Sequence, residues 1–310
     1  MTVYILNIGC ITPFCSGDLY NKENLPPPME ISLEDYGGKG KGLIINKEYL
    51  NKIDLPSKGL MSYQTRLAFI AYRNTNILKF LGNMKSYRGL IYIANGHISL
   101  EDETIDIIKK YALDKDNNFD FRLLGQNIDK MPPLDGIKML STAISHFIAK
   151  DLEINDPGHQ IYIGDNNSSA AIVEAYFKLK DMECDFALVV SSETPFFKHS
   201  YPYRNLALKK DIEKIGEGSY ACVLIGDKIM KDLNKQKKIE NLYQIKFADN
   251  KLYTQDINPK VEKNLIYYGS ADGLSKIYSS LSYKEFNSNI FNDRNGEGSI
   301  SSIHIERAVL

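Results

Sequence analysis

Residues 164–169, with the sequence GDNNSS, join an apolar run typical of a strand to an amphipathic run typical of a helix. A sharp strand-to-helix turn of small residues is where many enzymes place a nucleophile. This turn has no cysteine, and Asp165 is its only ionisable residue. A carboxylate acts as a general base where its surroundings tune its pKa. The turn is therefore an active site built on a carboxylate, the remnant of an active site, or a plain connection.

The histidines supply no obvious partner for such a turn. His97 follows a strand-like run, and loops at strand ends often carry function in α/β proteins. His146 lies in an amphipathic segment, and His304 lies in the segment that we expect to form the last helix. None of them has an obvious Ser or Cys partner in the sequence with which to form a nucleophile–base pair.

Neither a metal site nor a disulfide is expected. The histidines are scattered and no two cysteines form a CxxC pair, whereas zinc sites need clustered ligands. Cys10 and Cys222 fall in apolar strand-like runs, where a thiol usually acts as a small hydrophobe. The other two cysteines are Cys15 and Cys184. No cofactor motif is present either, because the glycine-rich segment 37–42 lacks the strand and the GK[ST] ending of a phosphate-binding loop.

The composition indicates a globular protein, with 43% hydrophobic and 25% charged residues. A formal net charge of −1 gives no reason to expect nucleic acid or an anionic membrane as a partner. No apolar run approaches the roughly 18–20 residues that cross a bilayer. The first residues lack the basic start and the cleavage site of a signal peptide, so we expect a cytoplasmic protein.

The elements that would position these residues alternate between strands and helices. Several predicted strands are apolar on both faces, as in a sheet covered by helices on each side. This alternation predicts an α/β fold. The predicted strands span residues 3–11, 89–95, 159–164, 185–193, 220–226, 242–249 and 264–270, and the predicted helices span 67–81, 137–152 and 168–182, the last capped by Ser168 or Ser169.

Two long segments are expected to be loops. Residues 21–60 contain LPPP, GGKGKG and many charges without a stable period. Residues 195–215 mix aromatic and basic residues, which are enriched at binding surfaces. This loop is therefore a candidate to line an apolar tunnel or to contact a partner, through Phe196, Phe197, Tyr201 and Tyr203.

Taken in order, the segments resemble the β-ketoacyl synthase family, whose members have the thiolase fold. VYILNIGCITPF resembles the opening strand and its Gly-x-x-Thr-Pro turn, and GEGSYACVLI resembles the Gly-Glu-Gly strand. NLIYYGSADG stands in the place of the His-Gly-Thr-Gly-Thr loop. The resemblance implies a layered αβαβα architecture. It further implies one thiolase-like unit, with an N-terminal half at 1–230 and an abbreviated C-terminal half at 231–310.

The same resemblance implies that the catalytic residues are replaced. Family members use a cysteine thiolate to hold an acyl group and two histidines to promote decarboxylation of the extender unit. Here Asp165 stands at the cysteine, Tyr268 at the first histidine and Asn292 at the second. No pair among these three restores a nucleophile and its base. We therefore expect a non-catalytic relative.

Cysteine-free relatives include chain-length factors, which pair with an active ketosynthase and help to shape the tunnel of a growing polyketide or polyene. The resemblance thus implies a heterodimer with an active ketosynthase and, through it, work on an acyl carrier protein. The strand at 159–164 would pair across the dimer axis, with Ile161 and Ile163 at the interface. Two alternatives stay open: a divergent acyltransferase or decarboxylase that relies on Asp165 or His97, and a self-associating binding protein, for which a homodimer suffices.

Overall fold

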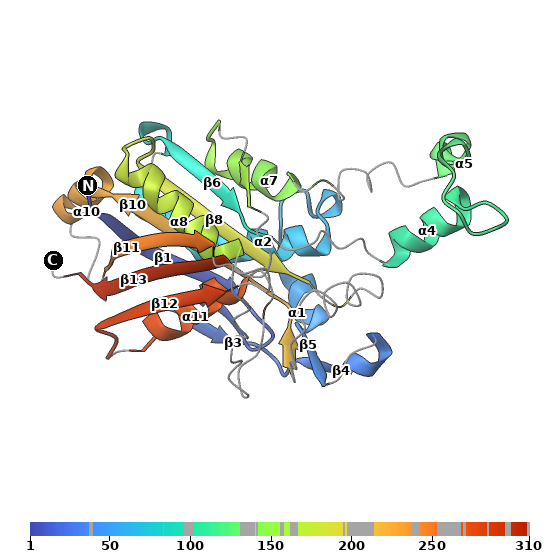
Figure 1. The fold of residues 1–310 in the computed structure, drawn as a ribbon, viewed down its shortest axis with the longest axis horizontal. Coiled ribbons are helices and arrows are strands. Elements are labelled where there is room, and N and C mark those ends of the chain that lie inside the picture. Colours follow the sequence, from blue (N-terminus) through green and yellow to red (C-terminus); the bar gives the residue numbers. More distant parts are fainter. Residues whose placement is uncertain are drawn as a thin grey trace.

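The computed structural model describes residues 1–36, 40–82, 84–95, 102–130, 140, 142–155, 158–161, 167–194, 196, 214–236, 242–252, 268, 271–283, 285–294 and 299–308. Within these residues one mixed sheet has ten strands (Figure 1). Along its main path the spatial order is β12 (Ser288–Arg294), β13 (Ser299–Arg307), β11 (Tyr243–Leu252), β1 (Val3–Ile11), β10 (Gly218–Gly226), β8 (Phe186–Glu193), β6 (Gly89–Ile93) and β7 (His159–Gln160). The strands β2 (Cys15–Asp18) and β3 (Lys22–Asn24) extend from β1 as a hairpin.

The central strands are those that the sequence makes apolar on both faces. Every residue of β8 and β10 is buried, and so is nearly all of β1. β1 and β8 are each antiparallel to β10, while β6 runs parallel to β8. The strands predicted at 3–11, 89–95, 185–193, 220–226 and 242–249 are thus confirmed. Of the strand predicted at 264–270, only Tyr268 lies within the described residues.

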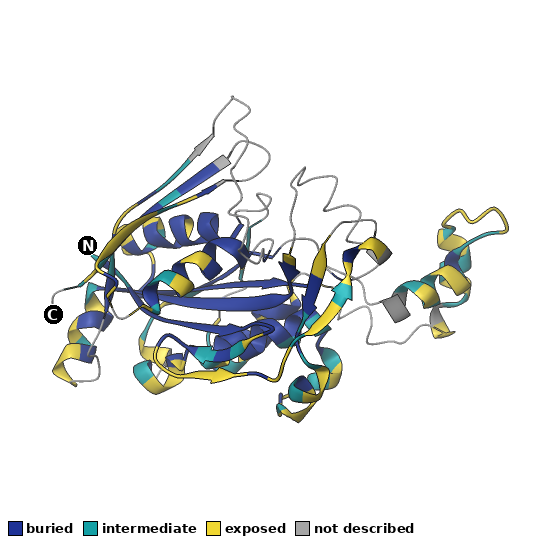
Figure 2. Ribbon diagram, turned by 90° about the horizontal axis from the view of Figure 1, so that it is seen from below, coloured by how far each residue is buried: buried dark blue, intermediate teal, exposed yellow. Residues whose placement is uncertain are grey.

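Helices lie on both faces of the central strands. α2 (Tyr63–Asn74) and α7 (Ala143–Leu152) cover one face. α8 (Asn167–Lys180) lies on the other face and packs against β8 on one side and against β11 and β13 on its opposite side (Figure 2). α11 (Asp272–Leu281) accompanies α8 between β10 and β12. The described chain therefore stacks in the order helices, central strands, helices, and then the strands β11 to β13 of the same sheet, which confirms the predicted layered α/β fold.

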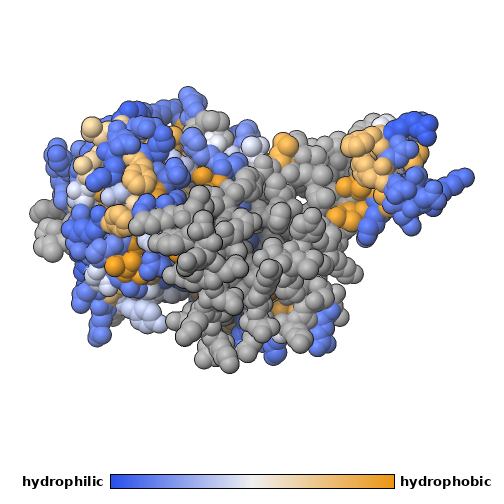
Figure 3. All heavy atoms as spheres, in the orientation of Figure 1, coloured by the Kyte–Doolittle hydropathy of each residue, from blue (hydrophilic) through white to orange (hydrophobic). Residues whose placement is uncertain are grey.

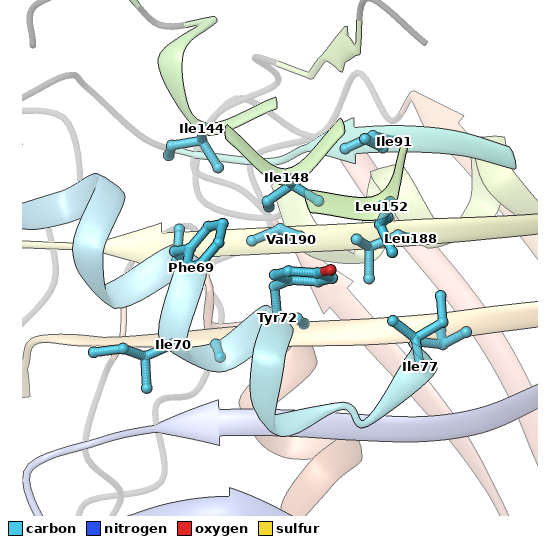
Figure 4. Packing of buried hydrophobic residues seen from close by; sticks show 14 of the residues in the cluster. Phe69, Ile70, Tyr72, Ile77, Ile91, Ile144, Ile148, Leu152, Leu188 and Val190 are labelled. Carbon is cyan, nitrogen blue, oxygen red and sulfur yellow. The ribbon is translucent and has the colours of Figure 1, made fainter. Parts of the chain in front are cut away.

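The core beneath α2 and α7 shows why these segments form helices. Phe69 and Tyr72 project from α2 onto Leu188 and Val190 of β8, and Ile148 of α7 closes over them (Figure 4). The Phe69 and Tyr72 rings meet edge to face at 5.4 Å. Burying each such side chain stabilises the fold by about 1.5–3 kcal/mol, which exceeds what helix propensity contributes.

One helix was predicted over residues 67–81, but two are present. α2 begins at the Ser62 cap, whose side chain accepts a hydrogen bond from the Thr65 amide. It ends at Asn74, and α3 (Ile77–Leu81) starts anew after Asn76. Asn76 has a φ of 56°, in the left-handed region that asparagine tolerates better than most residues. Spacing alone did not reveal this break, because the apolar positions continue across it.

The prediction of a loop over residues 21–60 is wrong. Besides β3, the segment contains β4 (Met29–Ser32), β5 (Lys41–Ile44) and α1 (Lys47–Lys52). β4 and β5 form a three-stranded sheet with β9 (Lys214–Gly216), so part of the segment 195–215 is also a strand. The GGKGKG stretch therefore ends inside a strand. A Cβ atom at Gly42 would lie 2.6 Å from the ring of Phe196 and from Ile31 Cγ1, so a larger residue would force these side chains to shift.

Two further predictions about strands need correction. The segment 159–164 was expected to be a central strand, but β7 lies at the edge of the described sheet and pairs in parallel with β6. Residues 162–166 lie outside the described residues. The last segment was expected to be a helix, but it is the strand β13. Its buried Ile303 and Ile305 alternate with the less buried His304, a period of two that is typical of strands.

The remaining helices lie around this frame. α4 (Asp102–Ala112) and α5 (Phe121–Gln126) form a projection that stands away from the layers in Figure 1. Hydrophobic side chains gather on it in Figure 3, and Phe119 and Phe121 are exposed there. α10 (Asp227–Lys235) follows β10. Short 3-10 helices occur at Leu33–Tyr36, Lys58–Leu60, Met84–Ser86 and Ile128–Lys130.

Candidate functional site

The candidate site lies at the start of α8, which begins inside the GDNNSS segment. Asp165 lies outside the described residues, and the described helix begins at Asn167. The Asn167 side chain donates to the carbonyl of Asn95, which follows β6, over 2.8 Å. Both serines that were expected to cap α8 lie inside its first turn and are buried. The start of the helix is therefore tied to the C-terminal end of β6. Functional loops of α/β sheets commonly lie at this end of the strands.

The two serines instead connect α8 to the C-terminal part of the chain. Ser168 Oγ accepts a hydrogen bond from the Leu274 amide of α11 over 3.2 Å. Ser169 Oγ donates to Asp293 Oδ2 of β12 over 2.8 Å. A side chain at Gly273 would collide with Ser169, so α11 approaches α8 closely at this point. These hydroxyls therefore connect α8 to α11 and to β12.

Asp293 also belongs to a charged cluster with Lys276 and Asp272. The Lys276 ammonium lies 2.7 Å from an Asp272 oxygen and 3.5 Å from an Asp293 oxygen. Partial burial acts to lower the pKa of Lys276, but the two carboxylates outweigh it and raise that pKa above its usual value. Lys276 therefore remains an ammonium at neutral pH. A permanently charged lysine cannot serve as a general base.

Tyr268 lies in an aromatic and thiol cluster, which consists of Cys10, Cys15, Tyr220, Tyr268 and Tyr278. Tyr268 is 6% exposed, and its ring meets Tyr220 edge to face at 5.7 Å. Burial is the main cause that raises the pKa of Tyr268 above its usual value. The phenol is consequently protonated and neutral at physiological pH. It cannot accept a proton there as a neutral imidazole does.

Asn292 lies on β12 beside the buried Asp293, but it points to the other face of the strand. It is exposed, and its side-chain oxygen accepts a hydrogen bond from Ser302 Oγ over 2.7 Å. Because side chains alternate along a strand, Asp293 is the residue of this pair that reaches α8. The structure thus brings Asp293 to the start of α8 and leaves Asn292 on the outer side.

The other candidate residues are distributed over the molecule. Phe196 is buried against Leu33 and Ile215, so it packs beside the small sheet. Ile161 is half-buried, and its amide donates to the Ile93 carbonyl over 2.9 Å. His304 contacts Ser288, with 2.9 Å between Nε2 and Oγ, and His146 lies in α7 as predicted. Candidates that lie outside the described residues are Ile163, Phe197, Tyr201, Tyr203 and His97.

Sequence reasoning missed a buried carboxyl group in the GEGS segment. Glu217 is 3% exposed and accepts hydrogen bonds from the Tyr63 hydroxyl over 2.6 Å and from the Ile45 amide over 2.7 Å. Burial raises the pKa of Glu217 to about 7. The Gly-Glu-Gly resemblance pointed to this segment but not to the partners. Those partners join α2 and the segment after β5 to the start of β10.

Two further features bear on the site. Among the described residues, no three His, Cys, Asp or Glu side chains are grouped so that they could hold a metal ion. No helix in the described part of the chain is long and apolar enough to cross a membrane. The described groups near α8 are hydroxyls and ion pairs. The described histidines His146, His159 and His304 belong to α7, β7 and β13 instead.

No protein-family model matches the sequence, and no curated protein matches it. Solved structures, in contrast, share its fold. One is a type II polyketide synthase complex, AntDE:AntF, of an acyl-carrier protein with its ketosynthase bound to the hexaketide. The match has a TM-score of 0.68 and 12% identity, and covers 98% of this chain and 99% of that chain.

The ishigamide ketosynthase/chain length factor matches with a TM-score of 0.67 and 9% identity, over 99% of each chain. The ketosynthase from module 1 of the bacillaene synthase of Bacillus amyloliquefaciens FZB42 matches with a TM-score of 0.61 and 12% identity, over 100% of this chain and 76% of that chain. Similarity at such low identity establishes the fold. The chain has the thiolase-like fold of ketosynthases, as the resemblance predicted.

Proposed function

We propose that this protein is a non-catalytic ketosynthase-like subunit of the chain-length-factor type. It pairs with an active β-ketoacyl synthase in polyketide, polyene or fatty-acid-type biosynthesis, and through that partner it works on chains held by an acyl carrier protein. The fold shared with a ketosynthase/chain length factor is consistent with this role. Fold alone does not determine function, whereas the residues of the site decide which chemistry is available.

The observation that carries the proposal is the environment of Tyr268. By resemblance this residue stands where family members have a catalytic histidine, and its phenol is buried among other aromatic rings. Its raised pKa leaves no base at that position near neutral pH. By the same resemblance Asp165 stands at the position of the nucleophilic cysteine, and an aspartate cannot form a thioester. A subunit that lacks both groups can still have a function if it binds an active partner and forms a dimer with it.

The edge position of β7 supports an association of this kind. β7 pairs with β6, and the chain continues from it into Ile161, which is half-buried, and then into Tyr162 and Ile163. β7 itself is polar, so the proposed association depends on the apolar residues that follow it in the sequence. We propose that a ketosynthase covers this edge, with Ile161 and Ile163 at the interface. A permanent interface of this type buries more than roughly 2,000 Å².

Co-expression with candidate ketosynthases tests the proposal. Each candidate carries an intact cysteine and two histidines, and one chain carries an affinity tag. We expect one candidate to co-purify in a one-to-one complex, which mass photometry would measure. The variant Asp165→Ala should assemble equally well, because the proposal gives Asp165 no chemistry.

The second arm measures acyl transfer directly. We incubate the isolated chain and the complex with an acyl-thioester donor and follow acylation by intact-protein and peptide mass spectrometry. The acyl group should appear on the partner's cysteine and not on residue 165. A stable adduct on Asp165, or turnover by the isolated chain, would instead establish the divergent acyltransferase or decarboxylase. A monomer that binds no ketosynthase would refute the subunit role.

A further inference from the structure

The hairpin of β1 and β2 brings two cysteines together. Cys10 pairs in register with Gly17, so Cys15 is its diagonal neighbour on the same face of the hairpin. The two sulfur atoms lie 4.0 Å apart. Thr12 stabilises the turn between them. Its hydroxyl oxygen accepts a hydrogen bond from the Cys15 amide over 3.1 Å and lies 3.4 Å from Cys15 Sγ. The pair is therefore a built feature of the turn and not a chance approach of two distant segments.

The two thiols differ in access to solvent. Cys10 is fully buried, and Cys15 is partly exposed. Tyr220 and Tyr268 pack beside them. The Lys22 ammonium lies over the Tyr278 ring, 4.8 Å from its centroid, in a cation–π contact. The remaining cysteines, Cys184 and Cys222, are buried elsewhere. Cys15 is thus the one cysteine of the chain with both partial exposure and a second thiol within reach.

The electrostatic environment makes the two sulfurs unequal in reactivity. The hydrogen bond from Cys10 is the largest cause that lowers the pKa of Cys15 to about 6, helped by Thr12 and Lys22 against the effect of burial. The same hydrogen bond and burial raise the pKa of Cys10. Cys15 is therefore mostly thiolate at neutral pH. A thiolate is the nucleophilic form of cysteine, whereas buried thiols are inert.

We propose that Cys10 and Cys15 are a reversible dithiol–disulfide site, with Cys15 as the sulfur that reacts first with a hydroperoxide. The Cys15 thiolate attacks one peroxide oxygen, the O–O bond breaks, and Cys15 becomes a sulfenic acid as the other oxygen leaves as hydroxide and takes up a proton. The Cys10 sulfur then attacks the Cys15 sulfur. The S–O bond breaks, the Cys10 proton leaves with the hydroxyl group as water, and an S–S bond forms. Hydrogen peroxide is thereby reduced to two waters by the two electrons of the thiols.

The geometry accommodates this bond with a local movement. The sulfurs must approach from 4.0 Å to about 2.05 Å, which side-chain rotation and a small shift of the partly exposed β2 can provide. The bond would fasten β2 to β1 beside Tyr268. A small-molecule thiol would reverse it by thiol–disulfide exchange. The site is independent of the proposed subunit role, because it requires neither a partner nor an acyl chain.

The test treats the folded full-length chain with one equivalent of hydrogen peroxide, blocks free thiols with iodoacetamide and digests with trypsin. Because Lys22 is the first lysine or arginine, one peptide contains both cysteines. We expect this peptide to lose two hydrogens and to resist alkylation until it is reduced. Cys15 should also react with iodoacetamide at least 10-fold faster than Cys184 and Cys222 at pH 7.

Variants assign the steps. Cys15→Ser should abolish the oxidation, Cys10→Ala should leave a sulfenic acid on Cys15 that dimedone traps, and Cys184→Ala should form the disulfide as the unaltered chain does. If Cys10→Ala fails to fold, the comparison of disulfide formation in the unaltered chain and in Cys15→Ser still tests the proposal. Two alkylated thiols after peroxide treatment, sulfinic acid on Cys15 without loss of hydrogens, or a disulfide only between molecules would each overturn the proposal.

Discussion

The two edges of the main sheet are built differently. β7 is two residues long and parallel to its neighbour β6, while β12 is seven residues long and antiparallel to β13. β12 reads SNIFNDR and carries polar or charged side chains at most positions. Beyond β7 the chain reads IYI, with Ile161 half-buried. Natural proteins blunt free edges with short strands and with polar or charged residues. β12 and the His-Gln pair of β7 both have such features, so the two sides differ in the apolar residues that follow β7 in the sequence.

This difference indicates where a second chain would bind. Both edges carry an isoleucine, but Ile290 of β12 is 57% exposed, whereas Ile161 lies against the core that α8 covers. A single apolar residue on an otherwise polar edge needs no partner. The proposed association is therefore expected on the β7 side, and the same substitution at both isoleucines tests the two edges against each other.

The largest effect is expected from Ile161→Lys. A charge placed in a strand-paired interface costs several kcal/mol, so the affinity for the partner ketosynthase should fall at least ~100-fold. The matched control Ile290→Lys should leave the affinity within about 2-fold, since that side chain already contacts solvent. Biolayer interferometry with the purified partner measures both.

Thermal unfolding of each variant separates lost association from lost folding. Ile161→Lys should still unfold cooperatively, because the side chain is only half-buried in the isolated chain. The edge comparison breaks down if both variants bind normally, or if Ile290→Lys is the one that loses the partner.

The next effect concerns neither edge. It sets how the free energy of unfolding changes with pH, in the unaltered chain and in both edge variants. Burial raises the pKa of Glu217 to about 7, above the value near 4.5 expected when unfolded. The folded chain binds the extra proton between these values, so stability is fully present below pH 4.5 and declines as pH rises through 7. This group should account for a loss on the order of 3 kcal/mol in the free energy of unfolding.

Glu217→Gln should remove that decline, because the amide oxygen still accepts from Tyr63 and Ile45 but does not ionise. Urea unfolding at pH 5 and pH 7.5 measures the difference. The edge variants should keep the slope of the unaltered chain. If the free energy of unfolding of Glu217→Gln falls between these pH values as much as that of the unaltered chain, other groups dominate the pH dependence.

The central part of the fold was predictable from sequence because burial on both faces leaves a local signature. β1, β8 and β10 are almost continuous apolar runs, and the small residues of GDNNSS indicate in the sequence where α8 begins. β13 was mistaken for a helix because its alternation was overlooked. β4 and β5 were missed because each has only four residues, and because β5 pairs with β9, a segment some 170 residues away.

The sequence pointed to the segments of the candidate site but not to their contacts, and Asp165 itself lies outside the described residues. The resemblance placed Asp165, Tyr268 and Asn292 by alignment. Which neighbour on β12 reaches α8 depends on strand register, and a shift of one residue exchanges the faces. Cys10 was interpreted as a small hydrophobe because it falls in an apolar strand-like run, and Cys15, five residues away, forms no CxxC pair with it. Only the hairpin brings their sulfurs to 4.0 Å.

A smaller effect is expected from Asp293→Ala on the β12 edge. It leaves the buried Ser169 hydroxyl without its acceptor and removes one of the two carboxylates around Lys276. Lys276 is 43% exposed and keeps its 2.7 Å contact with Asp272, so it does not become an isolated charge. The free energy of unfolding should fall by about 2 kcal/mol, measured by urea titration. Asp293→Asn, which keeps an acceptor for Ser169, should lose less, and an equal loss would show that the charge outweighs the hydrogen bond.

The smallest effect is expected one residue earlier, from Asn292→Ala. Asn292 is exposed, and its contact with Ser302 is a hydrogen bond between neutral groups that water readily replaces. The free energy of unfolding should change by less than about 0.5 kcal/mol, and the affinity for a ketosynthase should not change. A double-mutant cycle with Ser302→Ala should give a coupling energy of the same small size. Because Asn292 stands at the family's second histidine by resemblance, this result would mean that the position retains no part of a site. A loss of several kcal/mol, or a weakened complex, would place Asn292 in a contact that the outer face of β12 does not show, and the assignment of association to the β7 edge would then fail.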